Sequence, residues 1–352
     1  MKKMLLIAMM ALSVIACKRQ ANKDDVNTTT DLSGAGATFP LPYYNVIFKD
    51  YTEQTGGKVT YGGIGSGGGI RSLKDKTVDF GASDAFLSEA ELEEMPAEVI
   101  HIPTCIGAVV LAYNLPEVPE LILDGALVAD IFLGEINVWN DARIKALNPE
   151  ANLPSRGITP VYRSDGSGTT FVFSDYLSKV SPAWKDRMGT GKALKWNAGI
   201  ASKGNPGVAG TIQQTVGAIG YIGSEYALAL DIKSASLQNS AGNFVKANTA
   251  SISAAANADM PNDLRAMITN SPDPDAYPIS CLTWVLVYKE QGYNKRTQLQ
   301  ANSIRNLLDY ILSDKAQSVA AQVHYAPLPA SVAEKAKALV ASITYQGVVS
   351  GK

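Results

Sequence analysis

Residues 163–170 combine one cation, several hydroxyl groups and two glycines directly before an apolar run. This combination suits an anion, because a helix begins with unpaired N–H groups and a partial positive charge, and glycine lets an oxyanion approach them. The guanidinium of Arg163 could hold two oxygens of an oxyanion, with Asp165 keeping its planar fork in place. Taken alone, however, the segment is better explained as an ordinary helix N-cap at Ser167 or Thr169.

Two further glycine-rich turns with the same chemistry lie upstream, at residues 34–40 and 63–69. Each precedes a segment with the apolar spacing of a helix, so three helix starts could converge on one ligand. A nucleotide is not the ligand that these turns predict. None of them carries Gly-Lys-Ser/Thr at the spacing of a P-loop, and Gly65, Gly67 and Gly69 do not fit the dinucleotide frame G-x-G-x-x-G.

Asp84 follows a strand-like segment, residues 78–83, and carries the most specific chemical information. A carboxylate beside an anion site repels the ligand unless the ligand brings a proton to share. Protonated phosphate has such a proton and sulfate does not, so Asp84 would accept a hydrogen bond from phosphate and disfavour sulfate. The simpler interpretation is an aspartate that caps the helix or turn after Ser83.

The composition argues against several classes of protein and site. The formal net charge is −2 and charged residues make up 18% of the chain, with no basic stripe, so nucleic acid is not an expected partner. The two histidines, His101 and His324, lie far from each other and from cysteine, which argues against a metal site and against a Ser-His-Asp triad. Cys105 and Cys281 each lie in an apolar run, and we expect buried free thiols there rather than a disulfide.

The N-terminus has the features of an exported lipoprotein. Residues 1–16 begin with Met-Lys-Lys and continue as an uncharged, apolar stretch too short to span a bilayer, which predicts a signal peptide. The sequence Val-Ile-Ala-Cys that ends at Cys17 resembles a bacterial lipobox, in which the cysteine becomes the lipidated first residue. Residues 17–31 predict a flexible tether, so we expect a soluble body anchored by lipid in the cell envelope, in the periplasm or on the outer face of a membrane.

After the tether, short β-branched segments alternate with helical ones. This alternation predicts an α/β protein with mainly parallel sheets, in which ligands bind beyond the carboxyl ends of the strands. The three glycine-rich turns and Asp84 all occupy such positions. The main predicted strands are 59–61, 78–84, 99–113, 158–162 and 217–222, and the main predicted helices are 89–94, 126–133, 142–146, 297–311, 316–323 and 331–344.

A series of motifs occurs in a fixed order at residues 34–40, 63–69, 78–84, 123–125, 165–173, 203–205 and 217–221. Together they resemble the family of periplasmic phosphate-binding proteins of bacterial high-affinity phosphate ABC transporters. The resemblance implies a two-domain periplasmic-binding-protein fold of type II, with a hinge of two crossing strands and the ligand in the cleft between the domains. Residues 32–113 with 287–352 would form the first domain and residues 114–286 the second, and the crossings would lie at 109–114 and 283–289.

The resemblance also implies a ligand set, without a metal, a cofactor or catalytic residues. Backbone amides, hydroxyl groups, one arginine and one aspartate would hold the phosphate, with Asp165 pairing to the arginine. Gly67 stands where the family commonly has a serine, which should matter little because Ser66 carries the contact. The implied ligand residues are Thr38, Phe39, Ser66, Asp84, Arg163, Ser167, Gly168 and Thr169.

The function that the resemblance implies is that of a lipid-anchored monomer that delivers inorganic phosphate to the permease of an ABC transporter. It would not be an enzyme. Two alternatives stay open on the residues: the binding of another tetrahedral oxyanion such as sulfate or molybdate, and a phosphoryl-transfer enzyme with Ser66 or Ser167 as nucleophile. The second lacks a suitably placed base, a metal cluster and a P-loop lysine. A phosphate sensor without a transport role is a further alternative.

Overall fold

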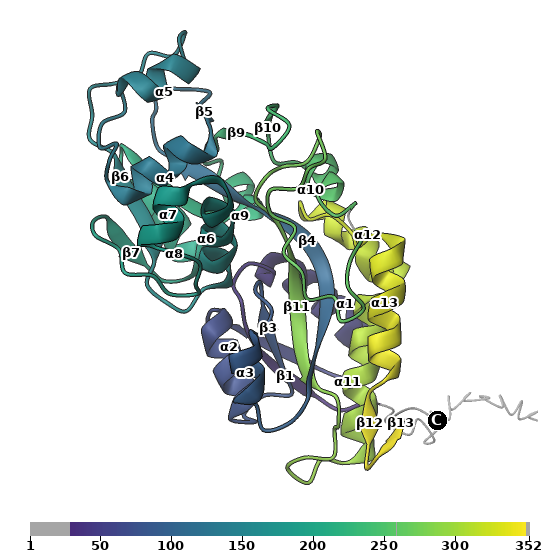
Figure 1. Cartoon of the computed structure of the whole chain (residues 1–352). Coiled ribbons are helices and arrows are strands. Elements are labelled where there is room, and N and C mark those ends of the chain that lie inside the picture. The colour runs from purple at the N-terminus through teal and green to yellow at the C-terminus, as the bar shows by residue number, and fades with distance from the viewer. Residues whose placement is uncertain (1–28, 258, 350–352) are drawn as a thin grey trace, which may run out of the picture.

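The computed structural model describes residues 29–257 and 259–349, which form two α/β domains built on one continuous sheet (Figure 1). The first domain contains both ends of the described chain, and the second is inserted between them. The elements of the first domain are β1 (Leu32–Gly36), α1 (Leu41–Thr55), β2 (Val59–Gly63), α2 (Ser66–Lys74), β3 (Phe80–Ser83), α3 (Glu89–Glu93), β11 (Ser280–Tyr288), α11 (Gln298–Ile311), α12 (Asp314–Gln322), α13 (Ala330–Ala341), β12 (Thr344–Tyr345) and β13 (Val348–Val349).

A single long strand, β4 (Val99–Tyr113), runs from the first domain into the second. The second domain then contributes a sheet flanked by helices and a small sheet at its far end. Its elements are β5 (Ile122–Leu123), α4 (Gly125–Leu133), α5 (Ala142–Leu147), β6 (Thr159–Arg163), α6 (Gly168–Val180), α7 (Pro182–Arg187), β7 (Ile200–Ser202), α8 (Gly204–Gln214), β8 (Ala218–Gly223), α9 (Ser224–Ala229), β9 (Ser236–Gln238), β10 (Phe244–Val245) and α10 (Thr249–Ala254).

The main sheet has eight strands in the order β2-β1-β3-β11-β4-β8-β6-β7. Its outer pairs are parallel, because helices connect those strands, but β11 pairs antiparallel with β3 and β4, and β4 pairs antiparallel with β8. The prediction of mainly parallel sheets is therefore wrong for the middle of the sheet. The reason is that β4 and β11 carry the chain in opposite directions between the domains.

Strand β4 is the structural link between the domains, and every one of its residues is buried. Its first part, through Ala108, pairs with β11, and its second part, from Val109, pairs with β8. The predicted strand at 99–113 is thus confirmed, as is a crossing near residue 109. The other predicted crossing, 283–289, falls mostly within β11, which pairs along its whole length, from Ser280, with β4 and in part with β3.

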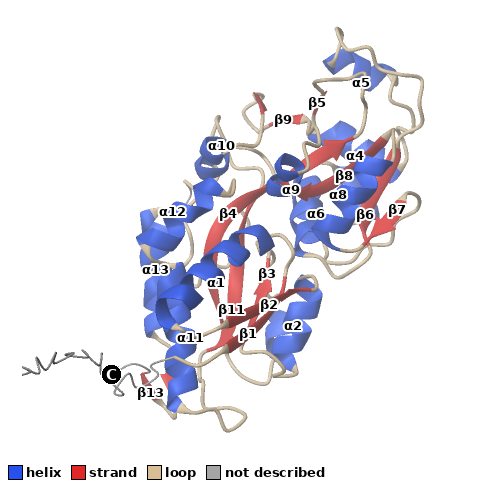
Figure 2. Cartoon of the chain, turned by 180° about the vertical axis from the view of Figure 1, so that it is seen from behind, coloured by secondary structure: helices blue, strands red, loops and turns tan. Residues whose placement is uncertain are grey.

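Aromatic packing fixes the turn between β1 and α1. Helix α1 buries Tyr44 and Phe48, whose rings stack at 4.9 Å, and these rings contact Tyr61 and Phe80 on β2 and β3. Figure 2 shows α1 lying across the strands of the first domain, with α11, α12 and α13 at its outer side. The helix therefore has one docked orientation, and its N-terminal turn is held at the edge that faces the second domain.

The predicted signal peptide, Cys17 and residues 17–28 of the predicted tether lie outside the described residues. Residues 29–31 belong to the folded body, because Thr29 is buried and the Thr30 N–H donates to Ser303 Oγ at 2.8 Å, so the predicted tether ends earlier than residue 31. No described helix has the length and apolar character that a membrane crossing requires. Cys105 and Cys281 are both buried, as predicted, and both are free thiols.

Candidate anion-binding site

The second and third glycine-rich turns meet across the boundary between the domains. Ser66 begins α2 in the first domain, and its Oγ accepts a hydrogen bond from the Gly168 N–H of α6 at 3.0 Å. The Gly67 N–H donates to the Gly166 carbonyl oxygen at 2.9 Å. The prediction that separate helix starts converge is confirmed for these two turns, and the domains are in contact around them.

Asn205 connects the first turn to the third. Its backbone N–H and its Nδ2 both donate to Thr38 Oγ1 at 3.0 Å, and Nδ2 also lies 3.2 Å from Thr169 Oγ1. Asn205 is the second residue of α8, after Gly204, whose φ of +68° favours glycine. Asn205 lies within the motif at residues 203–205, but its place in the site was not predicted, because no local sequence pattern places α8 opposite Thr38.

Arg163 ends β6 and is held by Asp165 in a bidentate pair. Its Nε lies 2.8 Å from Asp165 Oδ1 and its Nη2 lies 2.6 Å from Oδ2, while Nη1 lies 3.3 Å from Thr169 Oγ1. Burial raises the pKa of Asp165, but the hydrogen bonds and charge of Arg163 outweigh it and lower that pKa overall. The Arg163 side chain is only 1% exposed, so the cation is fixed with its Nη1 edge toward the turn of α6.

Asp84 lies directly after β3 and is 1% exposed. Its Oδ1 accepts a hydrogen bond from Thr283 Oγ1 on β11 at 2.8 Å. Burial raises the pKa of Asp84 to about 7, although the Thr283 hydrogen bond and the charge of Arg163 oppose the shift. The simpler interpretation, in which Asp84 caps the helix that follows, is wrong because Ser88 is the N-cap of α3.

Thr283 was not predicted as a site residue, because only the pairing of β11 with β3 brings it to Asp84.

Ser167 is the N-cap of α6, as the simpler interpretation of this turn predicted. Its Oγ accepts a hydrogen bond from the Thr170 N–H at 3.0 Å. A hydroxyl that accepts at its oxygen can still donate its proton, so capping does not remove Ser167 from the set of donors.

Phe39, in the first turn, is fully buried, and its carbonyl oxygen accepts a hydrogen bond from the Tyr325 hydroxyl.

The residues that the resemblance assigned to the ligand are therefore gathered at one place. Thr38 contacts Asn205, which contacts Thr169, which lies beside Arg163, and Ser66 contacts Gly168. Donors and the Arg163 cation lie around Asp84, whose carboxyl group is buried. Their role as ligands stays a prediction. Within residues 29–257 and 259–349, no group of three or more histidine, cysteine, aspartate or glutamate side chains is placed to hold a metal ion.

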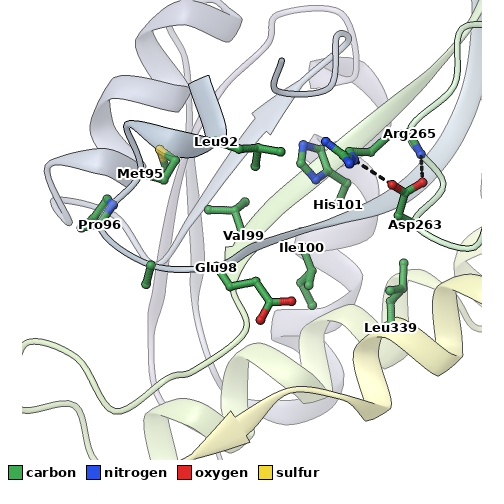
Figure 3. A pocket seen from close by; sticks show the side chains of 11 residues that line it. Leu92, Met95, Pro96, Glu98, Val99, Ile100, His101, Asp263, Arg265 and Leu339 are labelled. Carbon is green, nitrogen blue, oxygen red and sulfur yellow. Dashed lines mark hydrogen bonds and ion pairs between the residues drawn. The ribbon is translucent and has the colours of Figure 1, made fainter. Parts of the chain in front are cut away.

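A separate surface pocket of about 550 Å³ lies away from this site (Figure 3). Its cation is not free, because Arg265 pairs with Glu89 and with Asp263 at 2.9 Å each. Burial, followed by the charge of Arg265, lowers the pKa of His101 there to about 3, so this histidine stays neutral. None of the predicted ligand residues lines the pocket, whose lining is Leu92, Met95, Pro96, Ala97, Glu98, Val99, Ile100, His101, Asp263, Arg265 and Leu339.

Gly168→Ala should weaken anion binding about tenfold or more, because a clash of this kind costs on the order of 1–3 kcal/mol. A Cβ at Gly168 would lie 2.5 Å from Ser66 Oγ and 2.7 Å from the Asp84 nitrogen, so the domains could not approach as closely. Gly210→Ala on α8 is the matched control, since a Cβ there meets nothing within 4 Å. Isothermal titration of both variants checks the prediction, which fails if Gly168→Ala binds as tightly as Gly210→Ala.

An ion pair between the domains offers a test of closure. Lys192 Nζ lies 2.7 Å from Glu91 Oε1 on α3, and the Lys192 carbonyl oxygen accepts from the Ser167 N–H at 2.8 Å. Lys192→Met should weaken ligand affinity roughly threefold at low salt, since such pairs contribute about 0.2–1 kcal/mol. Lys74→Met removes the pair Lys74–Glu94 within one domain and is the control. Equal ligand dissociation rates for the two variants in stopped-flow experiments would contradict a role in closure.

Comparison with known proteins identifies the family. The model of the PBP superfamily domain matches residues 24–315. A phosphate-binding protein PstS of Xylella fastidiosa (strain Temecula1) is 40% identical over 94% of this chain and 95% of its own length. The phosphate-binding protein PstS of Haemophilus influenzae is also 40% identical, over 87% of this chain and 91% of its own. The chain belongs to the PBP superfamily and to the same family as these PstS proteins.

Solved structures share the fold of this family member. A high-affinity periplasmic phosphate-binding protein solved with bound phosphate superposes with a TM-score of 0.70, at 22% identity, over 88% of this chain and 93% of that chain. A phosphate-binding protein of Stenotrophomonas maltophilia superposes with a TM-score of 0.69, at 19% identity, over 88% of this chain and 94% of that chain. The expected two-domain fold of the type II periplasmic binding proteins is confirmed.

Proposed function

We propose that the chain binds inorganic phosphate in the cleft between its two domains and delivers it to the membrane permease of an ABC transporter. Relatives that match nearly the whole chain at 40% identity are named phosphate-binding proteins. The observation that carries the proposal is the fully buried carboxyl group of Asp84 in a site otherwise made of donors and one cation. While Asp84 is ionised, only an oxyanion that still carries a proton can bond both to the donors and to this carboxylate.

In this proposal the donors hold three oxygens of phosphate and Asp84 holds the fourth. Arg163 and the backbone N–H groups at the start of α6 supply positive charge, while hydroxyl groups such as those of Thr38 and Ser66 donate hydrogen bonds. The P–OH group donates its proton to Asp84, so no donor or acceptor of the bound ligand is left without a partner. The site performs recognition by hydrogen bonds alone.

Binding and closure are coupled in the proposed mechanism. The first and second turns lie on the first domain and the third lies on the second, so one phosphate that bonds to all three favours the closed state. The hinge is the pair of crossings at β4 and at the start of β11. The domain limits 32–113 with 287–352, and 114–286, stay a prediction.

We propose that the protein binds phosphate without a chemical step. A serine nucleophile needs a base within hydrogen-bond reach. Ser66 Oγ accepts from the backbone N–H groups of Gly168 and Asp84, and Ser167 Oγ accepts from that of Thr170. A purified protein that released phosphate from a chromogenic ester, with the release abolished by Ser167→Ala, would overturn the proposal in favour of an enzyme.

Phosphate should raise the midpoint of thermal unfolding of the purified protein, because a ligand that binds only the folded state stabilises it by RT ln(1 + [L]/Kd). Arsenate, which has the same shape and carries a proton at neutral pH, should act in the same way. Sulfate at the same concentration and ionic strength should have little effect. An equal shift with sulfate would mean that the site binds tetrahedral anions in general.

Cys17→Ser should yield a soluble, unacylated protein whose phosphate affinity is unchanged, because the proposed lipid lies far in sequence from the ligand residues. Stable attachment of a protein to a membrane by lipid requires more than one acyl chain, and the variant would carry none because it lacks the Cys17 thiol to which the lipid attaches. Fractionation of cells that express the wild type and the variant checks this outcome. Continued partition of the variant into membranes would contradict the lipobox.

The soluble variant should also elute as a monomer in size-exclusion chromatography.

A further inference from the structure

Glu225 is a buried acid at the boundary between the domains that the proposed ligand set does not include. It lies in the first turn of α9, is only 3% exposed, and neither of its carboxyl oxygens has a hydrogen-bond partner of good geometry. The carboxyl group folds back over Gly223, where an added Cβ would lie 2.0 Å from Oε1. Such a location is unfavourable for a charged carboxylate.

The hydroxyl of Tyr325 is the side-chain group that interacts with this carboxyl. Tyr325 belongs to the first domain, and it donates its proton to the carbonyl oxygen of Phe39 at 2.5 Å. A phenol has a single proton to donate. Glu225 can therefore form a good hydrogen bond with Tyr325 only as the donor, which requires a protonated carboxylic acid.

Among the other titratable groups near Glu225, Asp84 after β3 favours the same neutral form, because its charge raises the pKa of Glu225. Glu225 in turn raises the pKa values of Cys105 on β4, Cys281 on β11 and Tyr226 on α9 itself, and none of these groups is a cation. Burial raises the pKa of Glu225 to about 8. Hydrogen bonds from its own N–H and Tyr325 oppose this shift, and the charge of Asp84 adds to it.

The next residue, Tyr226, contacts the same turn of the first domain. Its hydroxyl donates to the carbonyl oxygen of Thr38 at 2.5 Å. The Thr38 carbonyl and the Phe39 N–H belong to one planar trans peptide, so this bond also fixes the direction of that N–H. Two consecutive residues of the second domain thus act on two neighbouring carbonyl groups of the first turn: Tyr226 bonds that of Thr38 directly, and Glu225 acts on that of Phe39 through Tyr325.

We propose that Glu225 is a positioning residue for phosphate: in the closed protein it is a neutral donor to Tyr325 and, through Tyr325 and Phe39, ties the first turn to the second domain. The proposal rests on the proposed function. When the domains separate, α9 leaves Tyr325 and the carboxyl group meets water, where glutamate has a pKa of about 4.3. Closure on phosphate therefore takes up a proton at Glu225 between that pH and about 8.

The test counts the protons that accompany phosphate binding. The wild-type chain, Glu225→Gln and the exposed control Glu53→Gln are titrated with inorganic phosphate by calorimetry, in buffers of different ionisation enthalpy, at about pH 6.5. Protons taken up or released by phosphate itself and by Asp84 contribute equally to the proton count of all three proteins. The wild type and Glu53→Gln should take up about one proton more than Glu225→Gln. The glutamine keeps a donor for Tyr325, so its affinity should stay within about threefold of wild type.

Equal proton counts for Glu225→Gln and wild type, with phosphate still bound, would overturn the inference and leave the proposed function intact. A wild type that gives no heat with phosphate would instead overturn the proposed function. If Glu225→Gln does not fold, infrared difference spectra of wild type labelled with ¹³C-glutamate replace it. Phosphate should then produce the carbonyl band of a protonated glutamic acid, and its absence would overturn the inference.

Removal of the Tyr325 hydroxyl group gives an independent check that Glu225 acts on Phe39 through Tyr325. Tyr325→Phe and Glu225→Ala should each weaken phosphate binding about fivefold, because each removes one hydrogen bond of the chain that ends at Phe39. The double variant should be no weaker than either single variant, since both act through the same bonds. If the two losses of phosphate affinity add in the double variant, Glu225 acts on affinity independently of Tyr325, which would contradict the proposal.

Discussion

Arg163→Ala should weaken phosphate binding roughly 150- to 5,000-fold, the largest loss that any single substitution in the site is expected to cause. The guanidinium supplies the only cation among the assigned ligand residues, and its removal also leaves Asp165 partly buried without its bidentate partner. Removal of one partner from a buried pair costs about 3–5 kcal/mol. Calorimetric titration, or competition for labelled phosphate where the heat is too small, measures the change.

Arg163→Lys separates charge from geometry. Lysine keeps the positive charge but cannot reproduce the planar fork that bonds Asp165, so its affinity should fall between those of wild type and Arg163→Ala. Arg143→Ala, which removes an exposed arginine paired with Asp141 and Asp130, is the control for a general loss of positive charge. An affinity of Arg163→Ala equal to that of this control would mean that Arg163 has a structural role alone.

Asp84→Asn should abolish the distinction between phosphate and sulfate. The amide loses the charged acceptor for the P–OH proton, which should weaken phosphate binding about 10- to 100-fold. It gains an N–H₂ donor, which sulfate can accept, so sulfate affinity should rise. Parallel titrations of both anions check the result. A variant that still prefers phosphate as strongly as wild type does would show that selectivity resides in other residues.

The same carboxyl group predicts a dependence of stability on pH. Burial raises the pKa of Asp84 from an ordinary value near 3.8 to about 7. A raised pKa means that the folded protein binds a proton more tightly than the unfolded chain, so this contribution to stability is complete below about pH 3.8 and is lost as pH rises through 7. Without phosphate, the unfolding free energy of Asp84→Asn should therefore fall less than that of wild type between pH 5 and about 8.

The parts of the fold that local sequence decides were predictable. The largely apolar segment at residues 99–113 predicts a long strand, and β4 has those bounds. Turns rich in glycine before helical spacing predict where α2 and α6 begin, and both helices begin there. In each case the decisive property is a pattern of adjacent residues, such as a hydrophobic run or a cap, that acts over one or two turns of chain.

The parts that escaped prediction depend on contacts between distant segments. Thr283 reaches Asp84 only because β11 pairs antiparallel with β3, and Asn205 reaches Thr38 only because α8 lies opposite the first turn. No local pattern distinguishes these side chains from ordinary polar residues of a strand or a helix. Glu225 carried no signal for the same reason: its burial against Tyr325 arises where the two domains meet.

A calorimetric titration of the wild-type protein with phosphate and with sulfate tests the central claim most directly, at equal ionic strength and at about pH 8, where Asp84 with its pKa of about 7 is mostly ionised. That claim is that a buried acceptor, Asp84, faces a set of donors and one cation and so selects an anion that carries a proton. Phosphate should bind at least about 100-fold more tightly than sulfate, because sulfate leaves Asp84 opposed to an oxygen without a hydrogen bond. Equal affinities for the two anions would contradict the claim.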